Sequence, residues 1–213
     1  MKIMTFNVRI WTRDTDSSSD VFWKKRMARM EALIKKENPD IICFQEMVFP
    51  ATCYIPSGYK RVGISAHHSM FVRKGFNCKV SNHCFSIFYE YADFDTKECG
   101  HFRLVNVHPR WEEDLSKKAL TKVNELVMGR SFVVCGDFNV TIEDARKNGL
   151  TEGDSVRETL GLEKKDTFKN YTRPTESHGE IDHFIIGGMP YPKSYKLIED
   201  YSMSDHCPLI IEL

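Results

Sequence analysis

Short apolar runs recur along the chain, and most of them end at a polar side chain. The run over residues 132–135 (Phe-Val-Val-Cys) is typical of a strand that is buried on both faces. Gly136 follows and allows a tight turn, and Asp137 and Asn139 come directly after it. Two interpretations of this stretch are open: an Asx turn that caps the next element, or a site for a divalent cation and a phosphate.

Five more apolar runs repeat this arrangement. Strands are predicted over residues 3–8, 41–44, 102–107, 181–186 and 209–211. Each has a polar residue within it or beside it, in chain order Asn7, Glu46, His108, Asp182, and the pair Asp205 and His206. A polar group in a buried strand is costly unless it is hydrogen-bonded or liganded. We therefore expect these residues to share a site at one edge of a sheet.

Two longer segments have the period of an amphipathic helix instead. Apolar residues recur at i, i+4, i+7 and i+11 over residues 23–34, and a similar stripe runs over residues 115–127. Shorter helices are expected after Thr141 and after Ser155, which are suitable N-caps. The apolar stripes predict helices that pack against a sheet.

The remaining segments are divided between strands and loops. Strands are predicted over residues 69–73, 80–91 and 195–198, whereas residues 47–63, 91–100 and 163–180 are predicted to form loops. No internal repeat, linker or low-complexity tract separates them. Residues 1–213 are therefore expected to form a single domain of sheets covered by helices, with a polar site at the strand ends.

Composition excludes one class of partner. The chain of 213 residues is 41% hydrophobic and 28% charged, which is ordinary for a soluble globular protein. Its 30 basic and 30 acidic residues give a formal net charge of zero. This argues against a protein that holds long duplex DNA by bulk electrostatics, which needs a basic surplus. A local basic patch, or a metal ion that supplies positive charge, is still compatible with it.

The sequence also bears on location. Asn7 and Arg9 interrupt the first apolar run, and no segment reaches the roughly 18 apolar residues of a membrane span, so neither a signal peptide nor a span is predicted. The seven cysteines are odd in number and contain no CxxC pair, which favours reduced thiols. We expect a cytoplasmic monomer without a membrane partner.

The polar residues at the strand ends indicate one kind of chemistry. Carboxylates, amides and two histidines, with no obvious nucleophilic Ser or Cys, suit metal-assisted hydrolysis of a phosphate ester. Oxygen ligands favour Mg²⁺ or Mn²⁺ as the cofactor. A carboxylate or a carboxylate-oriented histidine can activate the attacking water, and amide and imidazolium groups can stabilise the charge that develops on the phosphate.

Six short motifs carry a resemblance to a known family. They are Thr5-Phe6-Asn7, Gln45-Glu46, Asn106-Val107-His108, Gly136-Asp137-Phe138-Asn139, Ile181-Asp182-His183 and Ser204-Asp205-His206. In this order and spacing they resemble the endonuclease/exonuclease/phosphatase superfamily, which has the DNase I-like fold. The resemblance implies an α/β (α+β) protein, a four-layered α/β sandwich in which two central mixed β-sheets are flanked by helices. It also implies a metal-dependent phosphoric ester hydrolase with its site at one sheet edge.

The same resemblance implies a role for each residue. Glu46 would be the main metal ligand, assisted by Asn7 and Asp205. Asp137 would orient or deprotonate the water and Asn139 would hold the phosphate. His206, oriented by Asp182, would contact the scissile phosphate or act as the base, and His108 would stabilise the transition state. Which of Asp137 and His206 is the base, and whether one metal or two are used, stay open.

Three hypotheses about the substrate follow. The first is a nuclease-like phosphodiesterase acting on nucleic acid, with Arg9, Arg110 and Trp111, and also Trp11 and Arg13, contacting phosphates and bases. The second is a hydrolase of a small-molecule or lipid phosphoester, and the third is a catalytically silent binding module. Specificity for abasic sites is disfavoured, because the abasic-site endonucleases carry a Tyr where this chain has His108. Residues 47–100 form a shorter segment than in the superfamily, and substrate-recognition loops usually lie in such segments. The resemblance therefore does not imply the substrate specificity of any one member.

Overall fold

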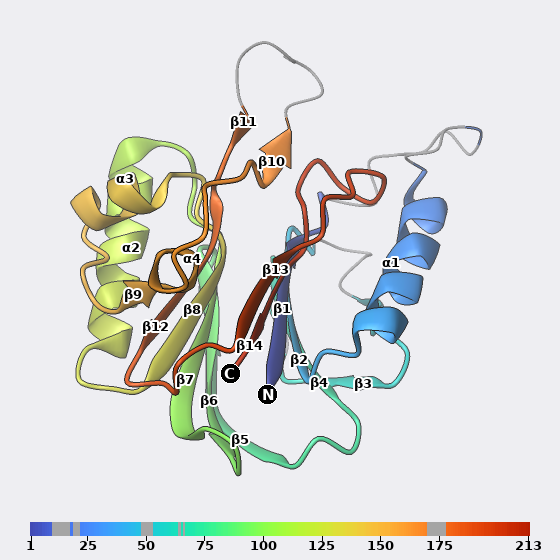
Figure 1. Ribbon diagram of the computed structural model, residues 1–213, viewed down its shortest axis with the longest axis horizontal. Coiled ribbons are helices and arrows are strands. Elements are labelled where there is room, and N and C mark those ends of the chain that lie inside the picture. Colours follow the sequence, from blue (N-terminus) through green and yellow to red (C-terminus); the bar gives the residue numbers. More distant parts are fainter. Residues whose placement is uncertain (10–17, 19–21, 48–52, 64, 66, 170–177) are drawn as a thin grey trace.

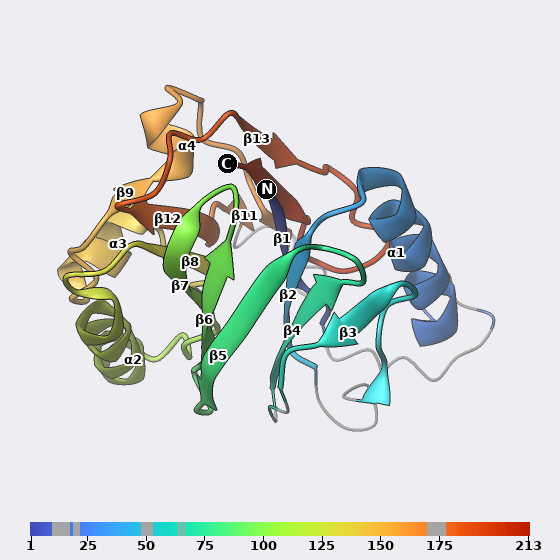
Figure 2. The ribbon, with the colours of Figure 1, turned by 90° about the horizontal axis from the view of Figure 1, so that it is seen from below.

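The computed structural model describes residues 1–9, 18, 22–47, 53–63, 65, 67–169 and 178–213. Two six-stranded β-sheets pack face to face in the middle of the molecule (Figure 1). Helix α1 (Trp23–Glu37) covers the outer face of the first sheet, and the other helices of the described chain lie on the side of the second (Figure 1 and Figure 2). The predicted four-layered α/β sandwich with two mixed sheets is confirmed.

The first sheet has the strand order β13-β14-β1-β2-β4-β3. Its strands are β1 (Lys2–Asn7), β2 (Ile41–Gln45), β3 (Tyr59–Arg61), β4 (His68–Arg73), β13 (Ser194–Leu197) and β14 (Leu209–Glu212). Only β1 and β2 pair in parallel, and the other neighbours are antiparallel. The outer face is covered by α1 (Trp23–Glu37), whose Met30 and Ile34 pack on Met4, Phe44 and their neighbours.

The second sheet has the strand order β5-β6-β7-β8-β12-β9. Its strands are β5 (Cys78–Phe85), β6 (Tyr89–Thr96), β7 (Gly100–Val107), β8 (Phe132–Asp137), β9 (Asp154–Ser155) and β12 (Asp182–Gly187). The helices on this side are α2 (Glu113–Val127), α3 (Ile142–Lys147) and α4 (Val156–Thr159). A separate short pair, β10 (Phe168–Lys169) and β11 (His178–Gly179), lies at one end of the molecule (Figure 1).

The apolar runs of the sequence form the core between the sheets. Ile3, Ile41 and Leu209 of the first sheet pack against Leu104 and Val133 of the second, and all five side chains are fully buried. Strands buried on both faces are expected to be nearly continuous apolar runs, which is the pattern of β1, β2 and β8. This core fixes the two sheets against each other.

A buried polar contact also joins the sheets, close to the strand ends. The Gln45 side-chain amide donates to Asn106 Oδ1 at 2.7 Å and to Thr5 Oγ1 at 2.9 Å. Asn106 Nδ2 in turn donates to the Phe44 carbonyl at 2.9 Å. Gln45 directly precedes Glu46, and Asn106 lies two residues before His108. The contact therefore fixes the relative position of side chains that come from different sheets.

Residues 86–100 correct the sequence prediction. One strand over 80–91 and a loop over 91–100 are wrong, because β5 ends at Phe85 and β6 continues to Thr96. Asp93, one of the acidic residues that favoured a loop, is buried and paired with Arg103 at 2.7 Å, and Glu90, also in β6, is buried and pairs with His83 at 2.8 Å. Burial of an acid is tolerated when it is paired and hydrogen-bonded. Strand β3 and the β10–β11 pair were likewise not predicted.

In the described part of the chain, no helix combines the length and the apolar character that crossing a bilayer requires.

Candidate active site

The strand ends gather at one end of the paired sheets. Parallel pairing puts Asn7 of β1 beside Gln45 of β2, and Val107 of β7 beside Gly136 of β8. The antiparallel pairing of β12 with β8 places Asp182 directly opposite Asp137. The predicted site residues therefore come together because of sheet register, although up to 199 positions separate Asn7 from His206 in the chain.

The Asp137 carboxylate is the centre of this cluster. Its Oδ2 accepts from Asn7 Nδ2 at 2.9 Å, and lies 3.5 Å from His108 Nε2 and 3.6 Å from His206 Nε2. Its Oδ1 accepts the Asn139 backbone N–H at 2.8 Å. Only 2% of the side chain is exposed. The hydrogen bonds from Asn7 and from the Asn139 N–H hold the carboxylate in one orientation. The Asx turn that the sequence offered as one interpretation is therefore present at Asp137, and it orients the carboxylate of this site residue.

The backbone around the site adopts conformations that side chains rarely allow. Gly136 has φ +139°, and a Cβ there would lie 2.1 Å from the Val107 carbonyl oxygen. Of the five non-glycine residues with positive φ in the described chain, Arg9, Glu46 and Asn139 lie at this site. Such strained residues persist where the surrounding structure holds them, and they are concentrated at functional sites.

His206 lies between two carboxylates. Its Nδ1 is 2.9 Å from Asp182 Oδ2 and its ring is buried. Burial by itself lowers the pKa of His206, but the negative charges of Asp182 and Asp137 outweigh it and raise the pKa to about 10. The imidazole is therefore doubly protonated at neutral pH, with Nδ1–H donating to Asp182 and Nε2–H directed toward Asp137.

Glu46 follows β2 and faces the open side of the cluster. Its Oε1 accepts from Asn7 Nδ2 at 3.2 Å and lies 3.9 Å from His108 Nε2. The Asn7 oxygen accepts the Arg9 backbone N–H at 2.9 Å. The amide of Asn7 thus connects Glu46 with Asp137, and about a quarter of the Glu46 side chain is exposed.

Asp205, directly before His206, forms an ion pair with Arg9. The Arg9 Nε lies 3.5 Å from Asp205 Oδ2, and the Ser204 hydroxyl donates to Asp205 Oδ1 at 3.2 Å. The Ser204 oxygen also accepts the backbone N–H of His206 at 3.3 Å. Arg9, expected from the sequence to contact substrate, is thus paired with an expected metal ligand.

An open pocket of about 430 Å³ leads to the cluster. Glu46, His108 and Asn139 line its inner part, and Asn139 Nδ2 donates to the Pro109 carbonyl at 2.8 Å. Arg110 and Trp111 form the rim, as expected, and 75% of Trp111 is exposed. Ile87, 58% exposed, lies on the rim as well. Trp11 and Arg13, the other two expected contacts, lie outside the described residues.

Two groups of donors bear on whether a cation fits here. In the described chain, Asp137, Asp182 and His206 place ligand atoms within 4.8 Å of one another, but a protonated imidazole already occupies the space between these carboxylates. Asn7 and Glu46 at strand ends, and Asp205 in the loop before β14, instead offer oxygen atoms, which are the ligands that Mg²⁺ and Mn²⁺ prefer. Glu46 Oε2 has no protein partner among the described residues and is not buried. The donor set at Glu46 therefore fits a hard divalent cation.

The sequence did not identify residues 167–169 as part of the site. The Thr167 hydroxyl oxygen accepts the Asp182 backbone N–H at 3.1 Å, and the Phe168 ring lies 4.8 Å from the His206 ring. The Lys169 backbone N–H donates to the Asp205 carbonyl at 2.8 Å. These contacts hold Asp182, Asp205 and His206 in position. A Thr-Phe pair within a polar stretch was the one available signal.

Two paired sheets thus carry an acid–imidazole cluster at a common edge. The sequence profile of the Endonuclease/Exonuclease/phosphatase family matches residues 4–206. The chain belongs to this family, and its fold is DNase I-like.

Known structures agree with this assignment. An endonuclease/exonuclease/phosphatase family protein from Bacteroides thetaiotaomicron superimposes with a TM-score of 0.80 at 17% identity, covering 99% of this chain and 96% of that one. D. rerio TDP2 complexed with single-strand DNA product gives 0.79 at 18% identity, covering 99% and 97%. A Bacteroides thetaiotaomicron mannosyl-6-phosphatase gives 0.76 at 18% identity, covering 100% and 98%. No curated protein matches the chain.

Proposed function

We propose that this chain is a Mg²⁺- or Mn²⁺-dependent phosphodiesterase that acts on nucleic acid through a water molecule activated at Asp137. The activity would reside in a single domain formed by residues 1–213. The observation that carries the proposal is the arrangement around Asp137 Oδ2, where Asn7, His108 and His206 converge within 3.6 Å. A fixed carboxylate beside two imidazoles at an open pocket is suited to in-line attack on a phosphate.

Asp137 is the proposed base. Its carboxylate is oriented by the Asn139 N–H and by Asn7, so it can accept a proton from a water without rearranging. His206 is the weaker candidate for this role, because the charges of Asp182 and Asp137 raise its pKa to about 10 and keep it protonated. This difference in protonation supports Asp137 over His206 as the proposed base.

His206 and His108 are proposed to act on the phosphate itself. A protonated His206, held by Asp182, can donate from Nε2 to an oxygen that becomes negative in the transition state. His108 lies on the other side of Asp137 and lines the pocket, so it can contact a second phosphate oxygen. Asn139 also lines the pocket and is proposed to hold the phosphate through its side-chain amide.

Glu46, Asn7 and Asp205 are the proposed residues for the metal ion. A bound Mg²⁺ or Mn²⁺ would neutralise phosphate charge and polarise the phosphoryl group. Asn7 contributes in a second way, because its amide nitrogen holds both Glu46 and Asp137 in position. Arg9 neutralises Asp205 in this structure, and we propose that it contacts a phosphate when substrate is bound.

Nucleic acid is the favoured substrate for two reasons. Trp111 and Arg110 at the pocket rim suit stacking on a base and contact with a phosphate. A structure of similar fold, D. rerio TDP2, is complexed with single-strand DNA product. The second candidate is a small phosphoester, which the similar fold of a mannosyl-6-phosphatase supports. A silent binding module is disfavoured, because every expected site position carries a reactive or liganding side chain.

A panel of phosphoesters tests the proposal. Purified protein with Mg²⁺ or Mn²⁺ should hydrolyse a bis-aryl phosphodiester and a labelled single-stranded oligonucleotide. Asp137→Ala and His206→Ala should each reduce kcat by about 10²–10⁴-fold, the usual contribution of acid–base groups. Asp95→Ala, which removes an exposed acid from β6, is the matched control.

The panel separates the alternatives. It also contains RNA, duplex and abasic DNA, tyrosyl–DNA adducts, nucleotides, sugar phosphates and inositol phosphates. If the protein hydrolyses only sugar phosphates, the second candidate function, hydrolysis of a small phosphoester, replaces the nuclease proposal. Equal background rates for wild type and Asp137→Ala on the whole panel would refute hydrolysis at this site.

A further inference from the structure

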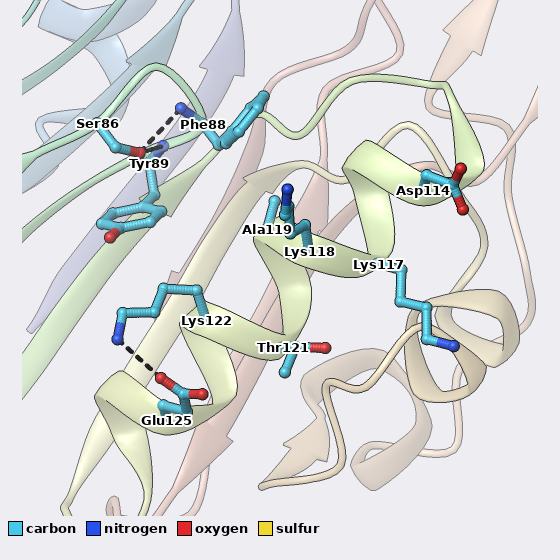
Figure 3. Close-up of a pocket in the computed structure, with 10 residues that line it drawn as sticks. All are labelled: Ser86, Phe88, Tyr89, Asp114, Lys117, Lys118, Ala119, Thr121, Lys122 and Glu125. Carbon is cyan, nitrogen blue, oxygen red and sulfur yellow. Dashed lines mark hydrogen bonds and ion pairs between the residues drawn. The ribbon is translucent and has the colours of Figure 1, made fainter.

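A second pocket, of about 690 Å³, lies beside α2 (Figure 3) and shares no lining residue with the pocket that leads to the acid–imidazole cluster. We call it the α2 groove. One wall is formed by Ser86 and Phe88 in the turn between β5 and β6 and by Tyr89 at the start of β6, and the other is the exposed face of α2 (Figure 3). The helix residues are Asp114, Lys117, Lys118, Ala119, Thr121, Lys122 and Glu125.

The α2 groove and the catalytic pocket are built from the same two segments. Ile87 lines the catalytic pocket, while its neighbours Ser86 and Phe88 line the α2 groove. Arg110 and Trp111 line the catalytic pocket just before α2 begins at Glu113. The His108 backbone N–H donates to the Phe88 carbonyl at 2.8 Å, so the two segments are joined directly. A flexible chain leaving the catalytic pocket across this rim can therefore enter the α2 groove.

The charges in the groove favour an anion. Lys122 is paired with Glu125 at 2.7 Å, which leaves Lys117 and Lys118 against Asp114. Among the described residues, neither Lys117 nor Lys118 has an ion-pair partner. Asp114 lies in the first turn of α2, where the helix dipole favours an acidic residue. The surplus positive charge of the groove therefore lies at Lys117 and Lys118, further along the helix.

The opposite wall adds aromatic surface. Phe88 and Tyr89 face α2 across the groove (Figure 3), and the side chain of Lys118 extends from the helix toward them. Aromatic faces next to lysine ammonium groups are the combination that holds single-stranded nucleic acid, since bases stack and phosphates pair. A zero net charge is compatible with such a local site, although it does not suit binding of long duplex DNA.

We propose that the α2 groove holds the part of a single-stranded nucleic acid that continues beyond the scissile phosphate. The proposal rests on the proposed nuclease function and specifies its substrate as a strand of several nucleotides. Lys117 and Lys118 would contact phosphates, and Phe88 would support a base. These residues would determine the affinity for long substrates and leave the chemical step unchanged.

The test compares substrates of different length. The Lys117→Gln/Lys118→Gln variant should raise KM about fivefold for a single-stranded 8-mer at low salt, with kcat unchanged. KM for a dinucleotide and for a bis-aryl phosphodiester should not change. The slope of log KM against log salt should fall by about 1.4, because each phosphate contact on a single strand contributes about 0.7. The control is Lys35→Gln/Lys36→Gln in the last turn of α1, which changes net charge equally.

The outcomes are distinguishable. If both double variants change KM for the 8-mer equally, net charge is responsible and the proposal fails. If the Lys117/Lys118 variant loses binding to phosphatidylserine vesicles and keeps its KM for the 8-mer, the two lysines bind an anionic lipid surface and the proposal also fails. If wild type cleaves the bis-aryl phosphodiester but no oligonucleotide, nucleic acid is not the substrate. The proposed function then fails in this part, and the groove proposal that rests on it fails with it. If the variant has unchanged kinetics on the 8-mer, the proposal for the α2 groove is overturned, and the proposed nuclease function is not affected.

Discussion

At the scale of single residues, one buried histidine lies beside the site. His68 begins β4, is fully buried, and places its ring 6.2 Å from the ring of His108. Among the residues that the structure describes, neither ring nitrogen of His68 has a hydrogen-bond partner. Burial lowers the pKa of His68 well below its usual value, and the nearby His108 and His67 add to this. The ring is therefore neutral in the folded protein.

This makes His68 a source of acid sensitivity. The unfolded chain binds a proton at His68 below about pH 6.5 and the folded chain does not, so stability is lost as pH falls through that value. His68→Leu should remove up to about 2 kcal/mol of the stability difference between pH 7.5 and pH 5. Urea unfolding at both pH values measures this, with exposed His101→Leu as the control. The same pH dependence in wild type and His68→Leu would contradict it.

At the scale of elements, α1 is attached to the loops that carry the site. Arg26 is 1% exposed, and its Nη1 donates to the carbonyls of Val8 at 2.9 Å and Met203 at 3.0 Å. Val8 follows Asn7, and Met203 precedes Ser204 and Asp205. One guanidinium therefore holds together the end of β1 and the loop before β14. Arg26 lies outside the apolar stripe that predicts α1, so the sequence pattern does not reveal this structural role.

Arg26→Met tests this attachment. The variant leaves two buried carbonyls without a donor, so the free energy of unfolding should fall by about 2–4 kcal/mol and kcat should fall with it. Arg29→Met is the matched control, because Arg29 lies one turn away and donates to the Ser202 carbonyl at an exposed position. Urea unfolding and bis-aryl phosphodiester hydrolysis of both variants give the comparison. Equal losses in the two variants would argue against the role of Arg26.

At the scale of the whole molecule, the two sheets contribute different parts of one site. Asn7, Glu46 and Asp205 come from the first sheet and its loops, while His108, Asp137 and Asp182 come from the second. The Gln45–Asn106 contact joins the sheets directly beneath them. An ion held by the first group next to the second would bind only when the sheets are assembled. Metal binding should therefore stabilise the entire fold.

Thermal unfolding measures this coupling without any substrate. At a Mg²⁺ concentration about 100 times its Kd, the folded state should gain about 2.7 kcal/mol. The Glu46→Gln variant should lose most of this gain, whereas Glu98→Gln, in the turn between β6 and β7, should keep it. An identical rise in Tm for wild type and Glu46→Gln would exclude Glu46 as a ligand.

Much of the fold and the site can be predicted from the sequence because both follow from local patterns. Asp137 and His108 each come directly after an apolar run, and parallel pairing of β7 with β8 brings such strand ends to one edge. Thr167 and Phe168 could not be found in this way, since an isolated bridge from Phe168 to His206 crosses 38 positions without periodicity. The burial of Asp93 likewise depends on Arg103, a partner from the next strand.

Three non-glycine residues with positive φ, Arg9, Glu46 and Asn139, surround the proposed metal and phosphate positions. Each costs the folded state on the order of 1–3 kcal/mol, and glycine at the same position would adopt the conformation without that strain. Glycine would also delete the guanidinium, carboxylate or amide that the chemistry requires. Improving thermal stability and preserving turnover are therefore opposed aims at these three positions, and a thermostable form of this protein is better engineered elsewhere in the chain.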